Sequence, residues 1–418
     1  MAQGYSSYNI ISSEISYKNS PNIDAFGRLR ISEPFTLFDS SHRFDDNGLW
    51  STGTATGGTA TFNAAQGLVD LAVTTTSGSE VIRETTKVFS YQPGKSLLVL
   101  STFVMSPAKA NLRQRVGYYG ANNGYYLELN DTTSVSFVER SFVTGGVVDT
   151  AVAQASWNVD PMDGSGPSGI TLDLTKAQIL FMDLEWLGVG TVRIGFVING
   201  NFYVCHKFHH ANIIATTYIT TASLPLRYEI TNTGVTSSAS ILKQICSTVL
   251  SEGGYQLTGL QQAVGIPVTT PRNLPVAGTF YPIVSIRLKT SPNRLDAIVI
   301  ATAISVVATT SGHYNWQVVA SGITGAGTWV NAPGDSSVQY NILGTSLTGG
   351  RILASGFFGV SNQGSTQVDI LKEALFKTQL ERDSFTSTPY ELTILVASDV
   401  GGGGGNVLAS MDWEEISR

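Results

Sequence analysis

Charge is scarce in this chain, and no basic cluster is present. Only 13% of its 418 residues are Asp, Glu, Lys or Arg, and 25 basic against 31 acidic residues give a formal net charge of −6. A protein that binds nucleic acid by following its phosphates needs a positively charged face. The sequence therefore argues against nucleic acid as a partner.

Cysteine is nearly absent as well. Cys205 and Cys246 are the only two, which is too few for a disulfide framework. We interpret both as small side chains that are buried or half-buried. A bridge between them would require that their two strands be neighbours.

Long apolar runs and a leader are also missing. The longest apolar run, residues 295–308, is interrupted by Asp296, Thr302 and Ser305, whereas a transmembrane helix needs about 20 apolar residues. The first residues of the chain lack the basic region and apolar core of a secretory signal. We therefore expect a soluble protein made in the cytoplasm, with no membrane insertion.

Apolar, aromatic and glycine residues are what the chain has in quantity. Hydrophobic residues make up 42% of it, with 43 Gly, 16 Tyr and 18 Phe. Aromatic residues favour strands, and Gly suits the tight turns between them. The length leaves room for two domains with sizeable cores. Because so few charges accompany this apolar content, we expect a homo-oligomer, such as a trimer.

The stretch 179–230 shows the period of two that a half-buried strand requires. Leu180, Met182 and Leu184 alternate with Asp183 and Glu185. Later apolar residues repeat this spacing: Val192, Ile194, Phe196 and Ile198, then Phe202, Val204 and Phe208, then Leu224, Leu226, Tyr228 and Ile230. We interpret the stretch as the heart of a β-sandwich.

An Asn-Gly turn at residues 199–200 joins two of these strands. A two-residue loop would turn Lys207 toward the buried face of residues 192–196, whereas a three-residue loop turns His206 toward it. We favour the three-residue loop, because burying a lysine costs more than burying a neutral histidine.

Strand-like segments recur along the chain at spacings of about 10–15 residues, as in β-sandwiches. We predict an all-β protein: an extended N-terminal arm (1–40), a jelly-roll or concanavalin-like β-sandwich (41–250), a linker (251–275) and a second, smaller β-sandwich (276–418). Helical spacing of apolar residues predicts one short helix at 368–380.

The segment 21–40 combines apolar anchors with two arginines. It reads either as an edge strand of its own domain or as an anchoring arm laid across a neighbouring subunit. The residues of this assembly arm are Ile23, Phe26, Arg28, Leu29, Arg30, Ile31, Phe35, Leu37 and Phe38.

The string NIDAFGRLRISEPFTLFDS, residues 22–40, includes the segment DAFGRLR and is followed by residues 44–50. It resembles the N-terminal signature of a family of structural proteins of tailed bacteriophages, and residues 186–193, 226–230 and 411–414 fit the same pattern. The resemblance implies a lectin-like or jelly-roll sandwich after this segment and a place in the virion. It carries over no active site.

Two sets of side chains have residue types that occur in metal sites or in glycosidase active sites. His206, His209 and His210 lie on a strand, where His206 and His210 are about 13 Å apart, so three metal ligands cannot converge. Asp183 and Glu185 share one strand face, as the acids of retaining glycosidases do, but the Glu-x-Asp-x-x-Glu motif of such enzymes is incomplete. We interpret both sets as polar surface and expect no metal, no cofactor and no catalytic residue.

Four tyrosines form the candidate glycan-binding set. They are Tyr118, Tyr119, Tyr125 and Tyr126, bordered by Asn122, Asn123 and Asn130. As exposed turn aromatics they could stack on a sugar ring, and as strand residues they would be cross-strand packing pairs.

The function expected from these observations is that of a non-enzymatic structural protein in the virion of a tailed bacteriophage, synthesised in the host cytoplasm. The arm would attach it to other virion proteins of the capsid or tail, as a capsid decoration or as part of a fibre. The alternative is a carbohydrate-binding adhesin that recognises a host surface glycan. A glycan-cleaving enzyme is a third hypothesis, and it depends on Asp183 and Glu185.

Overall fold

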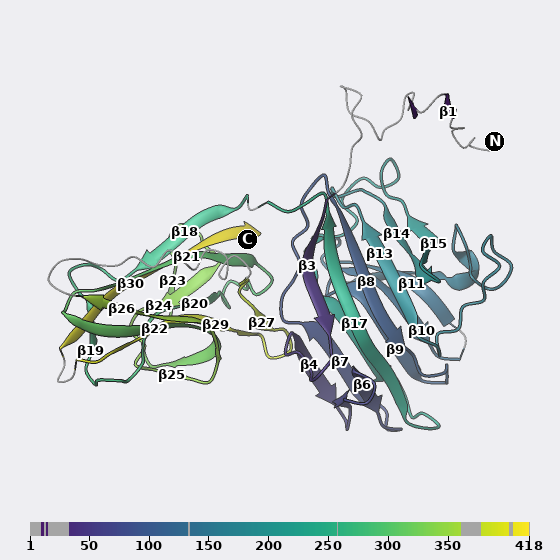
Figure 1. Ribbon diagram of the computed structural model, residues 1–418. Helices are drawn as coiled ribbons and strands as arrows, with labels where there is room; N and C mark the ends of the chain where they lie inside the picture. Colours follow the sequence, from purple (N-terminus) through teal and green to yellow (C-terminus); the bar gives the residue numbers. More distant parts are fainter. Residues whose placement is uncertain are drawn as a thin grey trace.

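The structure is a computed structural model that describes residues 10–11, 14–15, 33–132, 134–256, 258–360, 378–400 and 404–417. Apart from one short 3-10 turn, η1 (Gln154–Ser156), the regular elements within these ranges are all strands, which confirms the predicted all-β class. Among the described residues, no helix is long and apolar enough to cross a bilayer. Two β bodies lie side by side (Figure 1).

The first body is a sandwich of two antiparallel sheets. One sheet has the strand order β12-β11-β10-β9-β16-β7-β4, and the other has the order β15-β14-β13-β8-β17-β6-β5, with β3 also paired to β17. Its strands are β3 (Pro34–Ser41), β4 (Trp50–Ala55), β5 (Thr59–Asn63), β6 (Leu68–Val73), β7 (Glu80–Thr85), β8 (Ser96–Val104), β9 (Leu112–Tyr119), β10 (Gly124–Asn130), β11 (Ser134–Ser141), β12 (Val148–Ala153), β13 (Gln178–Leu184), β14 (Val192–Ile198), β15 (Asn201–Phe208), β16 (Leu226–Asn232) and β17 (Ser240–Glu252).

The core of this sandwich fills the space between its two sheets, as the alternation in 179–230 predicts. Leu180, Met182 and Leu184 on β13 are each at most 2% exposed, and they belong to one apolar cluster with Phe196 on β14 and Tyr228 on β16. The two sheets therefore bury the apolar rows of their facing sides against each other.

The hairpin of β14 and β15 combines both expected registers. Its loop has two residues, because Ile198 pairs with Asn201, and Asn199 and Gly200 both have the positive φ that a tight hairpin turn requires. A β-bulge then shifts the register, so that His206 faces Ile194. The predicted three-residue loop is wrong, yet His206 still reaches the predicted face.

The two cysteines are unpaired. Cys205 is fully buried on β15, as predicted. Cys246 is exposed, which corrects the expectation that it would be buried or half-buried. A bulge in β17 between Gln244 and Ser247 breaks the alternation there, and Cys246 falls on the outer side.

The second body is also built of two antiparallel sheets around its own core. A four-stranded sheet of β18, β19, β21 and β30 faces a sheet in which β23, β24, β20, β29, β22 and β25 follow one another and β26 also pairs with β22. Its strands are β18 (Leu260–Gly265), β19 (Arg272–Leu274), β20 (Tyr281–Leu288), β21 (Ile298–Ala308), β22 (Gly312–Gly325), β23 (Val330–Asn331), β24 (Val338–Asn341), β25 (Ser346–Thr348), β26 (Arg351–Val360), β27 (Arg382–Asp383), β28 (Thr388–Pro389), β29 (Glu391–Ser398) and β30 (Gly405–Ser417).

The predicted linker and the predicted helix can be compared with the observed strands. The stretch 251–275, expected to be a linker, contains β18 and β19, both paired with β30. Of the expected helix at 368–380, residues 368–377 lie outside the described residues. The short strands β1 (Ile10–Ile11) and β2 (Glu14–Ile15) pair with each other.

Three residues of the expected assembly arm are described. Phe35, Leu37 and Phe38 lie on β3, which pairs with β17 as a strand of the first sandwich. Phe38 is 3% exposed and joins the core, and Leu37 packs against it. The other arm residues lie outside the described residues: Ile23, Phe26, Arg28, Leu29, Arg30 and Ile31.

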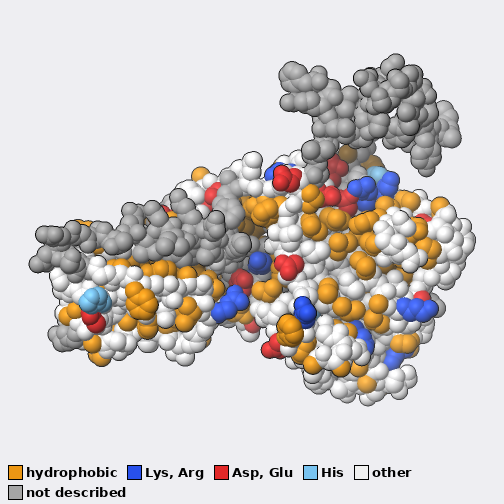
Figure 2. All heavy atoms as spheres, in the orientation of Figure 1, with side chains coloured by type: hydrophobic (Ala, Val, Ile, Leu, Met, Phe, Trp, Pro, Cys, Tyr) orange, Lys and Arg blue, Asp and Glu red, His pale blue; other side chains and the backbone are white. Residues whose placement is uncertain are grey.

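The two bodies are joined by an ion cluster centred on the buried Arg382. Arg382, on the β27 segment that reaches toward the first body in Figure 1, donates to the backbone oxygen of Thr85 at 2.6 Å and to the Glu84 carboxylate at 2.8 Å. Its Nε also donates to Asp296 at 3.0 Å. Arg382 is 3% and Glu84 4% exposed. Figure 2 shows charged side chains gathered at this boundary.

Close packing supports the same joint. The ring of Phe385 rests on β4, where a Cβ added at Gly53 would lie 2.8 Å from its Cδ1 atom. Only glycine leaves room for this contact. Val88 of the first body packs with Ile298 and Ile300 of the second.

We expect Arg382→Met to lower the free energy of unfolding by about 3 kcal/mol, because removing one partner of a buried ion pair leaves a carboxylate without its charge partner. Urea unfolding followed by tryptophan fluorescence measures the change. Arg351→Met is the matched control, since Arg351 is exposed at the start of β26. Equal stability of the two variants would contradict a joint that depends on this ion cluster.

Candidate functional site

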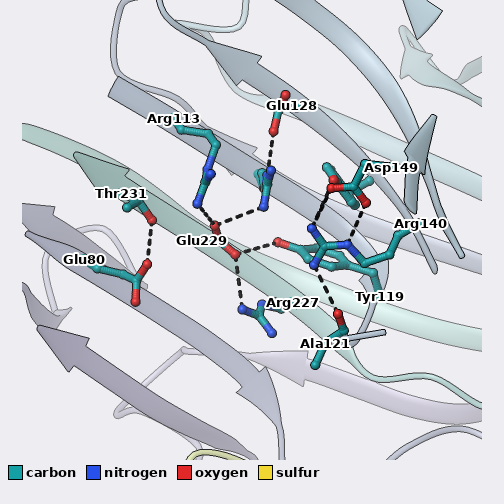
Figure 3. A network of polar contacts seen from close by, with 12 residues as sticks. Glu80, Arg113, Tyr119, Ala121, Glu128, Arg140, Asp149, Arg227, Glu229 and Thr231 are labelled. Atoms are coloured by element: carbon teal, nitrogen blue, oxygen red, sulfur yellow. Dashed lines mark hydrogen bonds and ion pairs between the residues drawn. The ribbon is translucent and has the colours of Figure 1, made fainter. Parts of the chain in front are cut away.

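The outer face of the seven-stranded sheet in the first body carries an unusual set of charges. Strand register sets them side by side: Arg115 on β9 pairs with Glu128 on β10 and with Glu229 on β16. Arg113 and Arg227 follow at spacing two on β9 and β16, so all five side chains share one face. Figure 3 shows Arg113 and Arg227 reaching Glu229 from either side, with Glu128 nearby.

Glu229 is the centre of this network and is only 2% exposed. Its Oε1 accepts from Arg113 at 2.9 Å and from Arg115 at 3.4 Å. Its Oε2 accepts from Arg227 at 3.2 Å and from the hydroxyl of Tyr119 at 3.4 Å. Burial opposes ionisation, but the three arginines outweigh it and hold the pKa of Glu229 below its ordinary value.

Two tyrosine rings lie beneath these arginines. Tyr119 and Tyr126 pack against each other with ring centres 4.5 Å apart. The guanidinium of Arg115 lies 4.8 Å from the ring centre of Tyr126, and that of Arg227 lies 5.3 Å from the ring centre of Tyr119. Arg140 lies over both rings and is itself paired with Asp149. Cations over ring faces stabilise this face but leave the rings no solvent-exposed surface.

The candidate glycan-binding tyrosines are therefore not exposed turn aromatics. Tyr118, Tyr119, Tyr125 and Tyr126 are each at most 1% exposed. Tyr118 points into the core, where its hydroxyl donates to the backbone oxygen of Ala222 at 2.8 Å. The hydroxyl of Tyr125 donates to Glu139. Strands β9 and β10 are neighbours, and Tyr119 on β9 pairs with Gly124 on β10. Cross-strand packing therefore buries all four rings.

The acid pair considered for glycoside cleavage is split by the end of β13. Asp183 lies on that strand, 7% exposed, and accepts from Arg193 on β14. Glu185 comes after the strand and is exposed. Both line a cleft of about 470 Å³ together with Lys95. With Asp183 held by an arginine, this cleft does not present two free carboxyl groups to a substrate.

The three histidines do not converge. His206 is 6% exposed, and burial lowers its pKa, with His209 adding to the effect. His210 is also 6% exposed. Its Nε2 lies 2.7 Å from Glu139 and its Nδ1 lies 2.6 Å from the backbone oxygen of Gly190. No group of three or more His, Cys, Asp or Glu side chains that could hold a metal occurs in the described part of the chain.

A polar cleft of about 580 Å³ lies where the charged sheet face meets the second body. The first body contributes Asn122 and Ser223 to it, and the second contributes Asn293, Ser384 and Phe385. Asn122 is exposed and makes no hydrogen bond within the described residues, and the Ser384 hydroxyl is buried with no partner. The amide of Asn122 is therefore free to bind a ligand.

One neighbouring residue fixes the shape of this cleft. Asn123 is 4% exposed. Its Nδ2 donates to the hydroxyl of Thr220 at 2.7 Å, and its Oδ1 accepts from the backbone N–H of Thr220 at 3.1 Å. The asparagine thus clamps the 120–123 turn onto the segment before β16.

Sequence reasoning missed most of this site. Arg227 and Glu229 alternate with the apolar residues of their strand, and Arg113 and Arg115 show the same spacing of two on another strand. That spacing was the available signal for a charged sheet face. The contribution of Asn293 and Phe385 had no signal, because it depends on how the two bodies meet.

Comparison with known proteins gives a likeness of fold only. No protein-family model and no curated protein matches the sequence. Among solved structures, the β-glucanase of Bacillus licheniformis covers 55% of this chain and 100% of its own, at 12% identity and a TM-score of 0.33. A carbohydrate esterase of the Shiga toxin-encoding bacteriophage phi24B covers 53% and 100%, at 12% identity and a TM-score of 0.32. Arcelin-5, a lectin-like protein of Phaseolus vulgaris, covers 54% and 100%, at 9% identity and a TM-score of 0.31. These are distant matches to concanavalin-like β-sandwiches.

We expect Glu229→Gln to destabilise the protein at pH 7 by about 3 kcal/mol, since three arginines lose their shared charge partner. Because the folded-state pKa of Glu229 lies below the ordinary 4.5, its stabilisation is present above pH 4.5 and is lost as the pH falls through the folded-state value. The stability gap between wild type and variant should therefore narrow on acidification, as measured by urea unfolding at a series of pH values.

Glu33→Gln serves as the control, because Glu33 is exposed just before β3. A gap that stays constant from pH 7 to pH 3 would contradict the account of Glu229 as a buried, ionised hub.

Proposed function

We propose that this chain is a non-enzymatic structural protein of a tailed bacteriophage particle, held to other virion proteins by the segment that precedes β3. The observation that carries the proposal is that two acids which could otherwise act on a substrate are each paired with arginine. Glu229 is held by three arginines and Asp183 by Arg193, so neither is a free carboxyl group.

The joint between the two bodies also supports a structural role. Arg382 ties Glu84 of one body to Asp296 of the other, with Phe385 seated over Gly53. A buried ion pair and close packing favour one fixed arrangement of the bodies over a hinge. Such a rigid pair suits a component of an assembly.

The place in a phage particle rests on the resemblance of residues 22–40. In this proposal the chain is found in the virion as a homo-oligomer, as a capsid decoration or as part of the tail or a fibre. The low proportion of charged residues, 13%, agrees with surface covered by neighbouring subunits.

Deleting residues 1–32 tests the attachment. The cut spares β3, whose Phe38 is part of the first core, so we expect the shortened chain to fold and to keep its unfolding midpoint. It should fail to incorporate into phage particles, measured by its amount in purified virions relative to the full chain.

A full chain with Phe26→Ala and Leu29→Ala is the milder companion variant, and incorporation reduced at least about tenfold is expected if these anchors fill pockets. Normal incorporation of the shortened chain would overturn the proposed attachment.

A second candidate function is recognition of a host surface glycan. The polar cleft between the bodies favours it, because the free amide of Asn122 lines it together with the ring of Phe385. Hydrogen-bonding groups next to an apolar ring face are what a sugar needs. The net charge of the cleft is balanced, since Arg227 and Arg382 are paired with Glu84 and Asp296.

We expect the purified full chain to bind neutral glycans on an array, and Asn122→Ala to abolish that binding without lowering the unfolding midpoint. Asn201→Ala, at the exposed start of β15, is the matched control. Binding that survives Asn122→Ala would place the glycan elsewhere, and an array without signal would remove this candidate.

A further inference from the structure

The strand β3 has one unpaired edge. It pairs with β17 along its length, and no other described strand pairs with it. Residues 35–39, five in succession, line a cleft of about 490 Å³. Because successive residues of a strand point to opposite faces, a cleft that touches all five follows the strand edge, where unused backbone N–H and C=O groups lie.

The walls of this cleft are mainly apolar. Tyr255 stacks on Phe35 with ring centres 5.5 Å apart, and Phe38 packs on Phe89 at 4.9 Å. Ile300 of the second body closes the far side. Phe35 is 40% exposed. An apolar channel beside an open strand edge provides both backbone hydrogen bonds and side-chain pockets.

One charged group in the cleft has no partner. Lys87 is half-buried, and its Nζ lies 5.9 Å from the ring centre of Phe38. No described residue forms an ion pair or a hydrogen bond with its ammonium group. Burial lowers the pKa of Lys87, and the negative charges of Glu381 and Asp39 only partly offset this effect. Removing a cation from water without pairing it with an anion costs free energy.

We propose that this cleft binds an extended segment of another polypeptide, which adds to the free edge of β3 as a strand and places a carboxylate on Lys87. Apolar side chains on either side of that acidic residue would fill the space between Phe35, Tyr255 and Ile300. Lys87 thereby selects for an acidic residue, while the strand edge selects for an extended backbone.

The shape of the cleft favours a peptide over a compact small molecule. Five strand residues extend over about 16 Å at 3.3 Å per residue, which matches the length of an extended pentapeptide. The inference goes beyond the proposed structural role, because it names the chemistry of a partner and holds whether or not that partner is a virion protein.

The test uses fluorescein-labelled peptides and the full chain, with binding followed by anisotropy. The first peptide is Ser-Val-Thr-Val-Glu-Val-Thr-Val-Ser. The second replaces its Glu with Lys, and the third carries N-methyl groups on alternate residues, which removes backbone donors on one edge. We expect the first to bind and the other two to bind at least about tenfold more weakly.

Lys87→Met should weaken the first peptide by at least about tenfold and abolish the preference for Glu over Lys. Lys176→Met is the matched control, because Lys176 is 78% exposed on the surface. Near-ultraviolet circular dichroism verifies that both variants are folded. Lys87→Arg provides a second variant that retains the charge and should keep the preference for Glu.

Several results would overturn the proposal. They are absence of binding by the first peptide, equal binding of the N-methylated peptide, or an unchanged preference in Lys87→Met. Binding that is seen only after deletion of residues 1–32 would instead assign the cleft to a segment of this chain. Each result is independent of incorporation into particles, so failure here is distinguishable from failure of the structural role.

Discussion

A single buried carboxylate, Glu229, organises the first body. Burying a carboxylate away from water is tolerable only when opposite charges and hydrogen-bond donors replace the water. Glu229 obtains three arginines and a tyrosine hydroxyl, and each of these partners comes with constraints of its own. Arg115 must also reach Glu128, and Arg227 must also reach Glu84. The requirement for charge balance therefore fixes how β9, β10 and β16 align and where the boundary with the second body begins.

The same network accounts for the buried tyrosines. Arginines that are held in place by carboxylates cover the faces of Tyr119 and Tyr126. The two rings are therefore buried although they lie on the outer face of a sheet. These rings consequently offer no surface to a ligand, and the clefts that could bind one lie at the edges of the first body. The polar cleft beside the second body and the apolar cleft beside β3 are two such clefts.

The all-β class and the core rows could be read from the sequence, because Leu180, Met182 and Leu184 follow a period of two that only a strand buries on one side. Tyr118 and Tyr125 could not be placed correctly, because the same period fits an exposed turn aromatic and a packed cross-strand pair. No sequence pattern indicates a β-bulge either, and bulges account for the wrong predictions at Cys246 and in the β14–β15 register. Each of the two clefts is lined by residues far apart in the chain, such as Asn122 and Asn293 in one and Lys87 and Ile300 in the other, and no local sequence pattern indicates that such residues meet.

Arg382 has a mechanical consequence for the molecule. Its guanidinium is shared by a backbone carbonyl and a carboxylate of one body and a carboxylate of the other, with an aromatic ring seated in the gap left by Gly53. A pulling or bending load applied to either body passes directly into the strands of its neighbour and spares the short connection after β17. The pair should behave as one stiff rod whose weakest point is the buried ion pair of Arg382 and Glu84, so that entry of water at this pair is the event that releases the two bodies from each other.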